Sequence, residues 1–200
     1  MESKETIERI YITKQDFVKV ENEVRFQEHL RRYASIRRFC YGKVLDFACG
    51  CGYGTHVLSV NPEVNLVTGL DIDANAVEWA RTHFASPKAK YIQADCREIN
   101  ESFNTLVCLE TIEHIRDINE LKELVERCGF DVLILSFPDK KSTHFNAFHF
   151  HDFVVQDMMD MFPDYLLFHA FKLVDVQFVL FTKKPKDAPA HIFRNLQDLA

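Results

Sequence analysis

Short apolar runs alternate with amphipathic segments over most of the chain. Five runs rich in Val, Leu and Ile have the length of buried strands, at residues 43–48, 65–71, 90–94, 104–109 and 131–137. After four of them, apolar residues recur at helical spacing near residues 53–60, 74–85, 117–128 and 151–161. Alternation of this kind predicts a parallel sheet, because right-handed crossovers lay each helix against the sheet between successive strands.

The pattern changes near the C-terminal end. Two β-rich runs, at residues 165–174 and 176–182, follow each other with no room for a helix. They predict a hairpin that adds an antiparallel strand to one edge of the sheet. The expected fold is therefore α/β: a doubly wound, mostly parallel, seven-stranded sheet with an antiparallel C-terminal hairpin strand and helices on both faces. A further amphipathic helix is expected over residues 22–40.

Composition excludes several classes of protein. The formal net charge of -6 over 200 residues gives no general attraction to phosphate, so nucleic acid is unlikely as a partner. No apolar run approaches membrane-spanning length, and the charged N-terminal residues lack a signal-peptide core, so we expect a cytoplasmic protein without membrane contact. The six cysteines lack Cys-x-x-Cys spacing, which favours buried thiols over a zinc site or disulfides.

The first predicted strand runs directly into alternating glycines, in the sequence VLDFACGCGYG at residues 44–54. Glycines let the main chain approach a nucleotide-like ligand, and the following helix presents free N–H groups to it. Acidic residues end the next two strands, at Asp71 and Asp95. Ligands of open parallel sheets lie beyond these strand ends, where a carboxylate suits the two hydroxyls of a ribose. The glycines alone leave NAD, a flavin or a nucleotide open.

Taken together, these motifs resemble the class I S-adenosylmethionine-dependent methyltransferases over about residues 28–182, in particular the small-molecule and sugar branch. The acidic residue and spaced glycines of the family's first motif match Asp46, Gly50, Gly52 and Gly54. The resemblance implies S-adenosylmethionine as cofactor and S-adenosylhomocysteine as product. The residues that it places at the cofactor are Tyr33, Asp46, Ala48, Cys49, Gly50, Gly52, Gly54, Asp71, Ile72, Asp95, Cys96, Leu109 and Glu110.

The resemblance also divides the chain. Residues 1–41 are expected to form an N-terminal arm and a helix that covers the cofactor, residues 42–183 the S-adenosylmethionine-binding methyltransferase domain, and residues 184–200 a C-terminal tail. Tyr33 of the covering helix has two interpretations, a place near the methionine end of the cofactor and a place in the core.

A first group of reactive side chains follows the fourth strand. Glu110, Glu113 and His114 are spaced to project from one face of a helical turn. With His149 they can hold Mg²⁺ or Mn²⁺, in a pattern that resembles small-RNA terminal 2′-O-methyltransferases and quinone-precursor O-methyltransferases. The alternative, that the glutamates cap a helix, is the one we favour, so no metal is predicted.

A second group follows the fifth strand. His149 and His151 share a face if the segment is extended and diverge if it is helical. The segment resembles the Asn-x-x-His element that lines the acceptor pocket in related sugar and small-molecule methyltransferases. An imidazole there can take the acceptor's proton, so the catalytic candidates are His149, His151 and His114. The alternative is that one histidine caps the next helix.

The expected function is O-methylation of a small polar acceptor such as a sugar or sugar nucleotide. Two alternatives stay open. One is a metal-dependent 2′-O- or catechol-type methyltransferase that uses Glu110, Glu113 and His114. The other is a cofactor-binding partner subunit without activity of its own.

Overall fold

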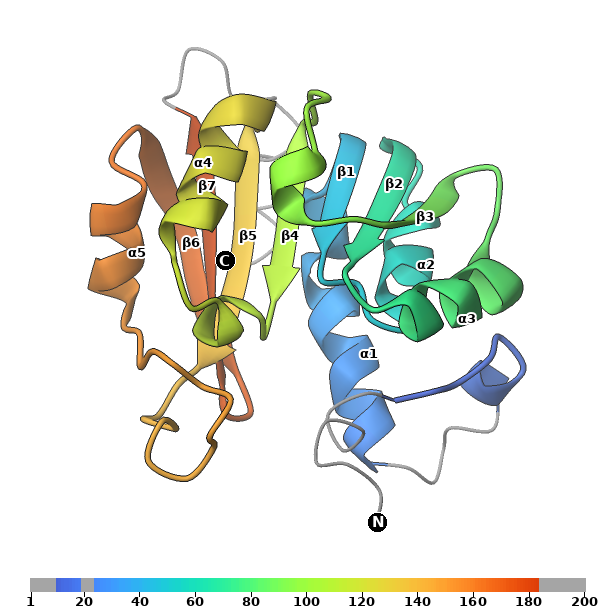
Figure 1. The fold of residues 1–200 in the computed structure, drawn as a ribbon, viewed down its shortest axis with the longest axis horizontal. Helices are drawn as coiled ribbons and strands as arrows, with labels where there is room; N and C mark the ends of the chain where they lie inside the picture. The colour runs from blue at the N-terminus through green and yellow to red at the C-terminus, as the bar shows by residue number, and fades with distance from the viewer. Residues whose placement is uncertain (1–9, 19–23, 184–200) are drawn as a thin grey trace. The chain divides into compact units, whose positions relative to one another are not determined.

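A computed structural model describes residues 10–18 and 24–183 of the chain. Its internal contacts divide the chain into two compact units, with the division between Asp95 and Cys96 (Figure 1). The expected C-terminal tail and the remainder of the expected N-terminal arm lie outside the described residues.

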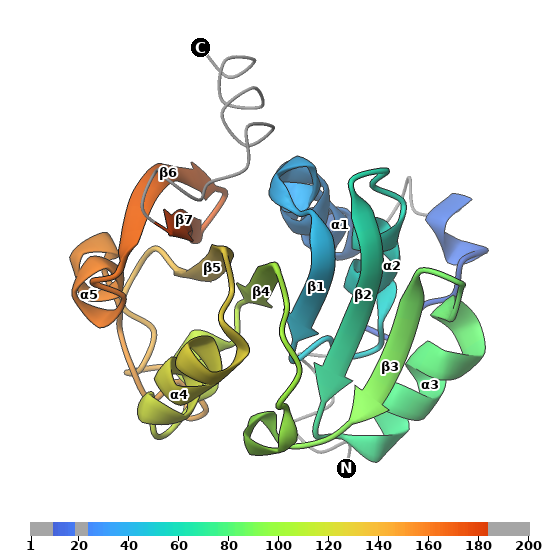
Figure 2. The ribbon, with the colours of Figure 1, turned by 90° about the horizontal axis from the view of Figure 1, so that it is seen from above.

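The first unit is a parallel three-stranded sheet with helices against it. Its strands are in the order β3-β2-β1 and its helices lie on the same side of them (Figure 2). The strands are β1 (Gly42–Phe47), β2 (Val64–Asp71) and β3 (Ala89–Gln93), and the helices are α1 (Val24–Ile36), α2 (Tyr53–Ser59) and α3 (Ala74–Phe84). The helix expected over residues 22–40 is thus confirmed as α1, followed by a 3-10 turn at Arg37–Phe39.

Helix α3 begins where its sequence predicts. The carboxylate of Asp73 accepts hydrogen bonds from the backbone N–H groups of Asn75 and Ala76, at 2.8 and 3.0 Å. These are two of the donors that a helix start leaves without intrahelical partners. The apolar face expected to turn inward is buried, and consists of Ala76, Val77, Ala80 and Phe84.

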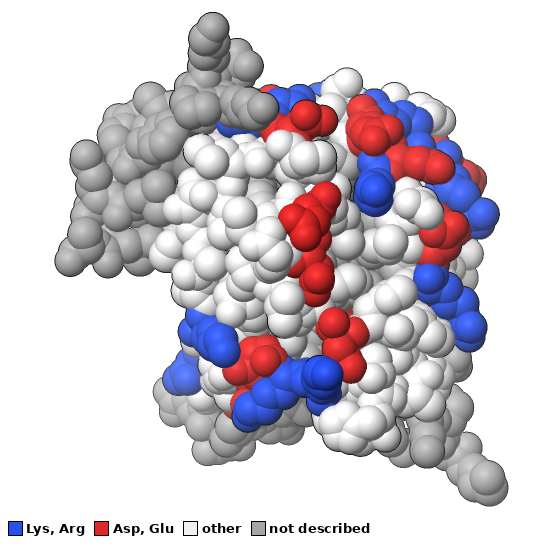
Figure 3. Space-filling model, turned by 90° about the vertical axis from the view of Figure 1, so that its left-hand side faces the viewer, with Lys and Arg blue, Asp and Glu red and all other residues white. Residues whose placement is uncertain are grey.

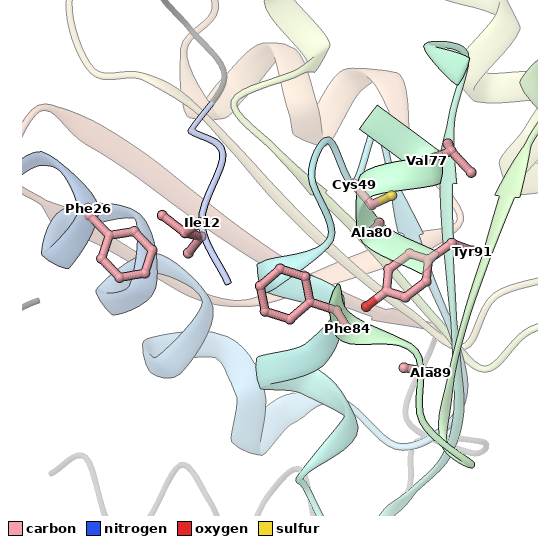
Figure 4. Close-up of a cluster of buried hydrophobic side chains, with 8 residues drawn as sticks. All are labelled: Ile12, Phe26, Cys49, Val77, Ala80, Phe84, Ala89 and Tyr91. Atoms are coloured by element: carbon pink, nitrogen blue, oxygen red, sulfur yellow. The ribbon is translucent and has the colours of Figure 1, made fainter. Parts of the chain in front are cut away.

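An N-terminal segment, residues 10–18, packs on the same core. Ile12 lies in a cluster of buried side chains that joins α1 to α3 and β3 (Figure 4). The indole N–H of Trp79 donates to the carbonyl oxygen of Ile12 at 2.8 Å. Asp16 closes the turn of the segment by accepting from the backbone N–H and the hydroxyl of Thr13. This part of the expected arm is therefore packed on the first unit.

The second unit carries four strands in the order β4-β5-β7-β6. Strands β4 (Thr105–Leu109) and β5 (Val132–Pro138) are parallel, whereas β7 (Val176–Lys183) is antiparallel to both β5 and β6 (Tyr165–Leu173). The predicted C-terminal hairpin is confirmed. Two helices, α4 (Asn119–Cys128) and α5 (Val155–Met161), and two 3-10 turns, η5 (Cys96–Glu98) and η6 (Ile112–His114), complete the unit.

One helix starts later than its sequence suggests. Residues 149–154 form neither helix nor strand, and α5 begins only at Val155. The backbone N–H of Val154 donates to the Asp157 carboxylate at 2.8 Å, which caps this start. His151 and Asp152 therefore precede the helix, and their side chains form hydrogen bonds with residues of earlier loops.

The expected α/β fold is confirmed. Parallel βα order continues from β1 to β5, and the antiparallel hairpin brings the number of strands to seven. Within the described ranges, no helix combines the length and the apolar character that crossing a membrane requires.

Candidate functional site

The glycine loop leaves β1 in a left-handed turn. Ala48 and Gly50 have φ values of 57° and 54°, and the backbone N–H of Cys49 donates to the carbonyl oxygen of Leu70 at 2.9 Å. A side chain built on Gly50 would meet no heavy atom of the described chain within 4 Å. The turn therefore presents bare backbone to open space, as a loop that receives a ligand must.

The next two glycines are required by packing. A Cβ atom on Gly52 would lie 2.5 Å from the Cβ of Ala80 and 2.8 Å from the ring of Tyr91. On Gly54 it would lie 2.0 Å from the Cζ atom of Tyr33. The glycine spacing thus reflects two needs, a bare turn at its first position and close helix contacts at the other two.

Asp71 ends β2 and is tied to the glycine loop. Its two carboxylate oxygens accept from the backbone N–H groups of Gly50, at 2.8 Å, and Asp73, at 2.9 Å. These two hydrogen bonds fix the orientation of the carboxylate, a group that can accept about four. The next residue, Ile72, is 73% exposed and offers an apolar surface beside a buried carboxylate.

Asp46 and Tyr33 form a buried polar pair below the loop. The Asp46 carboxylate accepts from the hydroxyls of Thr55, at 2.5 Å, and Tyr33, at 3.2 Å. Burial raises the pKa of Asp46 to about 7, and the two hydrogen bonds counteract that rise. Burial also raises the pKa of Tyr33, with the Asp46 charge adding to the effect. Tyr33 is thus a core residue that also contacts the first acidic residue of the motif.

The remaining residues expected at the cofactor lie at strand ends. Asp95 is half-buried two residues beyond β3, and Cys96 is buried at the start of η5. Leu109 is buried at the end of β4.

Glu110 does not share a helical face with Glu113, as their spacing suggests. The residue has a φ of 49°, and its backbone N–H donates to the hydroxyl of Ser136 at 3.0 Å. The same hydroxyl donates to the Glu110 carboxylate at 2.9 Å. The expected helical face holding Glu110, Glu113 and His114 is wrong, because this left-handed residue precedes a 3-10 turn and directs Glu110 toward β5.

Three other candidates converge in the second unit. Glu113, His114 and His149 each offer a ligand atom, and these atoms all lie within 4.8 Å of one another. Glu113 is buried, and both imidazoles are half-buried. The two rings meet edge to face, with their centroids 4.6 Å apart. The structure therefore brings together three members of the expected metal set. We call this group the Glu113 cluster.

Hydrogen bonds orient both imidazoles of the Glu113 cluster. The Nδ1 atom of His114 lies 3.1 Å from the carbonyl oxygen of Phe148. A carbonyl only accepts, so Nδ1 carries the proton and Nε2 presents a lone pair in the neutral ring. The Nδ1 atom of His149 lies 2.6 Å from the Ser142 hydroxyl, which can donate or accept.

Ser142 and Asp152 support this arrangement, and the sequence reasoning assigned neither of them a role. Asp152 accepts from the backbone N–H groups of Ser142, at 2.6 Å, and Thr143, at 3.1 Å, and from the Thr143 hydroxyl at 2.6 Å. The Thr143 hydroxyl and these amides hold the pKa of Asp152 at about 2. No motif signals the pair, since a single serine and aspartate ten residues apart are common in loops.

His151 lies apart from His149. Its Nε2 atom is 2.9 Å from the carbonyl oxygen of Ile115, and its ring stacks on Phe153. The backbone N–H of Phe150 also donates to the Glu113 carbonyl oxygen, at 2.8 Å. These contacts hold residues 149–151 against the turn after β4, with His149 and His151 engaged by different partners.

Comparison with known proteins gives one family and several relatives. Residues 44–129 match the model of a methyltransferase domain. Phosphoethanolamine N-methyltransferase of Triticum aestivum is 29% identical over an alignment of 152 residues that covers 60% of this chain and 30% of that protein. Ubiquinone biosynthesis O-methyltransferase of Vibrio campbellii is 37% identical over an alignment of 81 residues that covers 38% of this chain and 34% of that protein. The chain thus spans about a third of the length of these curated relatives.

Solved structures share the fold. The magnesium protoporphyrin IX methyltransferase of Synechocystis PCC 6803, crystallised with bound SAH, has a TM-score of 0.66 to this chain at 16% identity, with 90% of this chain and 99% of that chain covered. The family match covers the glycine loop, Asp71 and the cluster residues Glu113 and His114. Residues 44–129 are therefore a methyltransferase domain, and the chain has the fold of the solved class I methyltransferases.

Proposed function

We propose that this protein transfers the methyl group of S-adenosylmethionine to a hydroxyl group of a small polar acceptor, such as a sugar or a sugar nucleotide. The glycine loop, Asp71 and Ile72 of the first unit bind the cofactor. The Glu113 cluster of the second unit binds the acceptor hydroxyl. The convergence of Glu113, His114 and His149 is the observation that carries the acceptor part of the proposal.

The chemistry of a hydroxyl acceptor explains the imidazoles. The hydroxyl oxygen attacks the methyl carbon, the bond from carbon to sulfur breaks, and the hydroxyl proton must leave. A positioned base contributes about 100- to 10,000-fold to such a step. His149, oriented by Ser142, takes that proton, and the neighbouring Glu113 carboxylate stabilises the imidazolium that results. His114, oriented by the carbonyl oxygen of Phe148, completes the pair of imidazoles.

A divalent cation in the Glu113 cluster is the second candidate. Its donor set is one carboxylate oxygen and two imidazole nitrogens. Both rings have a hydrogen-bond partner on Nδ1, and metal-bound histidines usually have such a partner on the nitrogen that does not bind the metal. Two nitrogen donors suit Mn²⁺ better than Mg²⁺, which prefers oxygen. A bound cation would polarise neighbouring hydroxyls of an acceptor diol. Glu110, engaged with Ser136, is left out of this set.

The charge distribution argues against a nucleic-acid acceptor. The formal net charge is -6. On the face drawn in Figure 3, acidic side chains run in a stripe across the middle, and lysines and arginines lie beside acidic residues near the rims. A phosphate backbone binds where positive charge gathers, and this face has no such area among its described residues.

The test is transfer of a labelled methyl group from S-adenosylmethionine to a panel of sugars, sugar nucleotides, catechols, short RNA and phosphoethanolamine. We expect product with a hydroxylated small molecule and loss of at least about 100-fold in rate for His149→Gln. His169→Gln, on strand β6, is the matched control. Exclusive methylation of phosphoethanolamine would overturn the choice of oxygen as the acceptor atom.

The same assay separates the two candidates. A rate that survives exhaustive chelation supports the imidazole base, whereas a rate that is lost and then restored by Mn²⁺ supports the cation. If the protein binds cofactor but methylates nothing until a co-purified protein is added, the non-catalytic subunit is the better description.

A further inference from the structure

A cavity of about 380 Å³ opens in the second unit where β5 ends beside the turn between β6 and β7. Its volume lies within the range of about 300–1,000 Å³ that is usual for small-molecule sites. Ser142 lines this cavity, and its hydroxyl lies 2.6 Å from Nδ1 of His149. Ser142 therefore connects the lining of the cavity to His149 of the Glu113 cluster.

The charges around the cavity cancel. Its lining carries two lysines, Lys140 and Lys141, and two aspartates, Asp139 and Asp175. Lys140 pairs with Asp175 at 3.1 Å, and Asp139 pairs with Lys172 at 3.2 Å. A phosphorylated or otherwise strongly charged ligand would find no net attraction here. A neutral ligand with many hydroxyls fits better, because carboxylates accept its O–H groups and ammonium groups donate to its oxygens.

Two lining residues have features that a hydroxylated ring would satisfy. The Oδ1 atom of Asp139 is buried and receives no hydrogen bond from the described part of the chain. Rotation of this carboxylate toward an incoming hydroxyl would supply the missing bond, and buried polar atoms without partners are rare in proteins. Phe145 also lines the cavity, with 73% of its surface exposed. An exposed aromatic ring offers a flat apolar surface to the C–H face of a sugar.

We propose that this cavity binds a second sugar ring of the acceptor, next to the ring whose hydroxyl is methylated. The inference rests on the proposed function and narrows its substrate class to glycosides of at least two rings. Asp139 selects for hydroxyl donors and Phe145 for a ring with an apolar face. A catechol, which has one ring and two hydroxyls, would leave the cavity unused.

Amide NMR spectra of the full chain, titrated with maltose, lactose, cellobiose and mannobiose and separately with catechol, test this proposal. We expect at least one disaccharide to shift the signals of Lys140 and Phe145 saturably. Phe145→Ala should weaken that binding roughly five- to tenfold. Asp139→Asn should weaken it by about tenfold or more, the usual effect of losing a hydrogen bond to a charged group.

Two matched controls isolate the cavity. Phe148→Ala removes an exposed phenylalanine of the same loop that does not line the cavity, and Lys172→Ala breaks the ion pair of Asp139 without removing its carboxylate. Both should bind the disaccharide as the parent does. The proposal is overturned if no disaccharide shifts these signals, if catechol shifts them equally, or if the controls weaken binding as much as the cavity variants.

The titration needs no turnover, so the two proposals fail separately. Sugar binding at the cavity without methyl transfer would sink the proposed function and leave the cavity assignment standing. If sugars are methylated at a rate that neither Phe145→Ala nor Asp139→Asn changes, the proposed function stands and the cavity assignment fails.

Discussion

The hydroxyl oxygen of Ser142 lies 2.6 Å from Nδ1 of His149. Ser142 is itself held in place by Asp152, which accepts its backbone N–H at 2.6 Å. The bond therefore fixes the direction of an imidazole that lies in an irregular segment between β5 and α5. An imidazole that takes a proton must hold its free nitrogen toward the acceptor, so Ser142 is a positioning residue for the proposed reaction.

Replacing Ser142 with Ala should lower kcat for the best acceptor by about tenfold, because a misdirected base keeps only part of its contribution. KM should change little, and the acid limb of the pH profile should move, which loss of packing alone would not cause. Ser142→Thr retains the hydroxyl and should recover most of the rate. Ser102→Ala, at an exposed serine of the same unit, is the control. A Ser142→Ala variant with the parent's kcat and pH profile would rule out the positioning role.

The contact between Gly54 and Tyr33 gives a prediction about stability. Alanine is normally the better helix residue by about 1 kcal/mol, so Gly54→Ala would stabilise α2 if space allowed. Its Cβ would instead lie 2.0 Å from the Tyr33 ring. We expect a net loss of about 1–3 kcal/mol in the free energy of unfolding, measured by urea denaturation.

The same substitution in a Tyr33→Ala background should cost much less, because the obstructing ring is gone. The pair of measurements forms a double-mutant cycle that isolates the contact. A Gly54→Ala protein that is more stable than its parent would show that α1 and α2 do not pack as described.

The regular elements could be predicted because their residues repeat a simple pattern. A strand expected over residues 65–71 is observed as Val64–Asp71, since its apolar side chains are buried and Asp73 then starts a helix. Glu110 could not be placed in this way. Its left-handed backbone depends on Ser136, 26 residues later, and a non-glycine residue gives no local sign of such a conformation.

The histidine segment shows the same limit. His149 and His151 were expected to share a face if the segment is extended, yet the backbone N–H of His149 donates to the carbonyl oxygen of Asn146 in a turn. The chain then runs past Glu113 and Ile115, which engage Phe150 and His151 through their carbonyl oxygens. Contacts between distant loops decide this arrangement, and residue periodicity carries no information about them.

The buried Asp46 predicts how stability depends on pH. Burial raises its pKa to about 7 in the folded protein, against about 3.9 for an unperturbed aspartate. Between these values the folded state binds more protons than the unfolded state, so this group's contribution to stability falls as pH rises from about 4 to about 7. Above that range the contribution is constant.

Asp46→Asn cannot titrate, so its stability should decline less with pH over that interval. Urea midpoints of parent and variant are measured at several pH values across the interval. Subtracting one curve from the other cancels the contributions of the other titrating groups. Asp164→Asn, at an exposed aspartate, should follow the parent. Parallel curves for parent and Asp46→Asn would contradict a raised pKa at this position.

We infer that Asp71, fixed by the backbone N–H groups of Gly50 and Asp73, holds the ribose of S-adenosylmethionine. Calorimetric titration with S-adenosylhomocysteine tests it most directly, using the parent, Asp71→Ala and the surface control Asp164→Asn. We expect one binding site per chain in the parent and the control. Affinity should be weakened about 100-fold or more in Asp71→Ala, because charge-assisted hydrogen bonds to two hydroxyls are lost. No heat of binding in the parent, or equal affinity in Asp71→Ala, would contradict it.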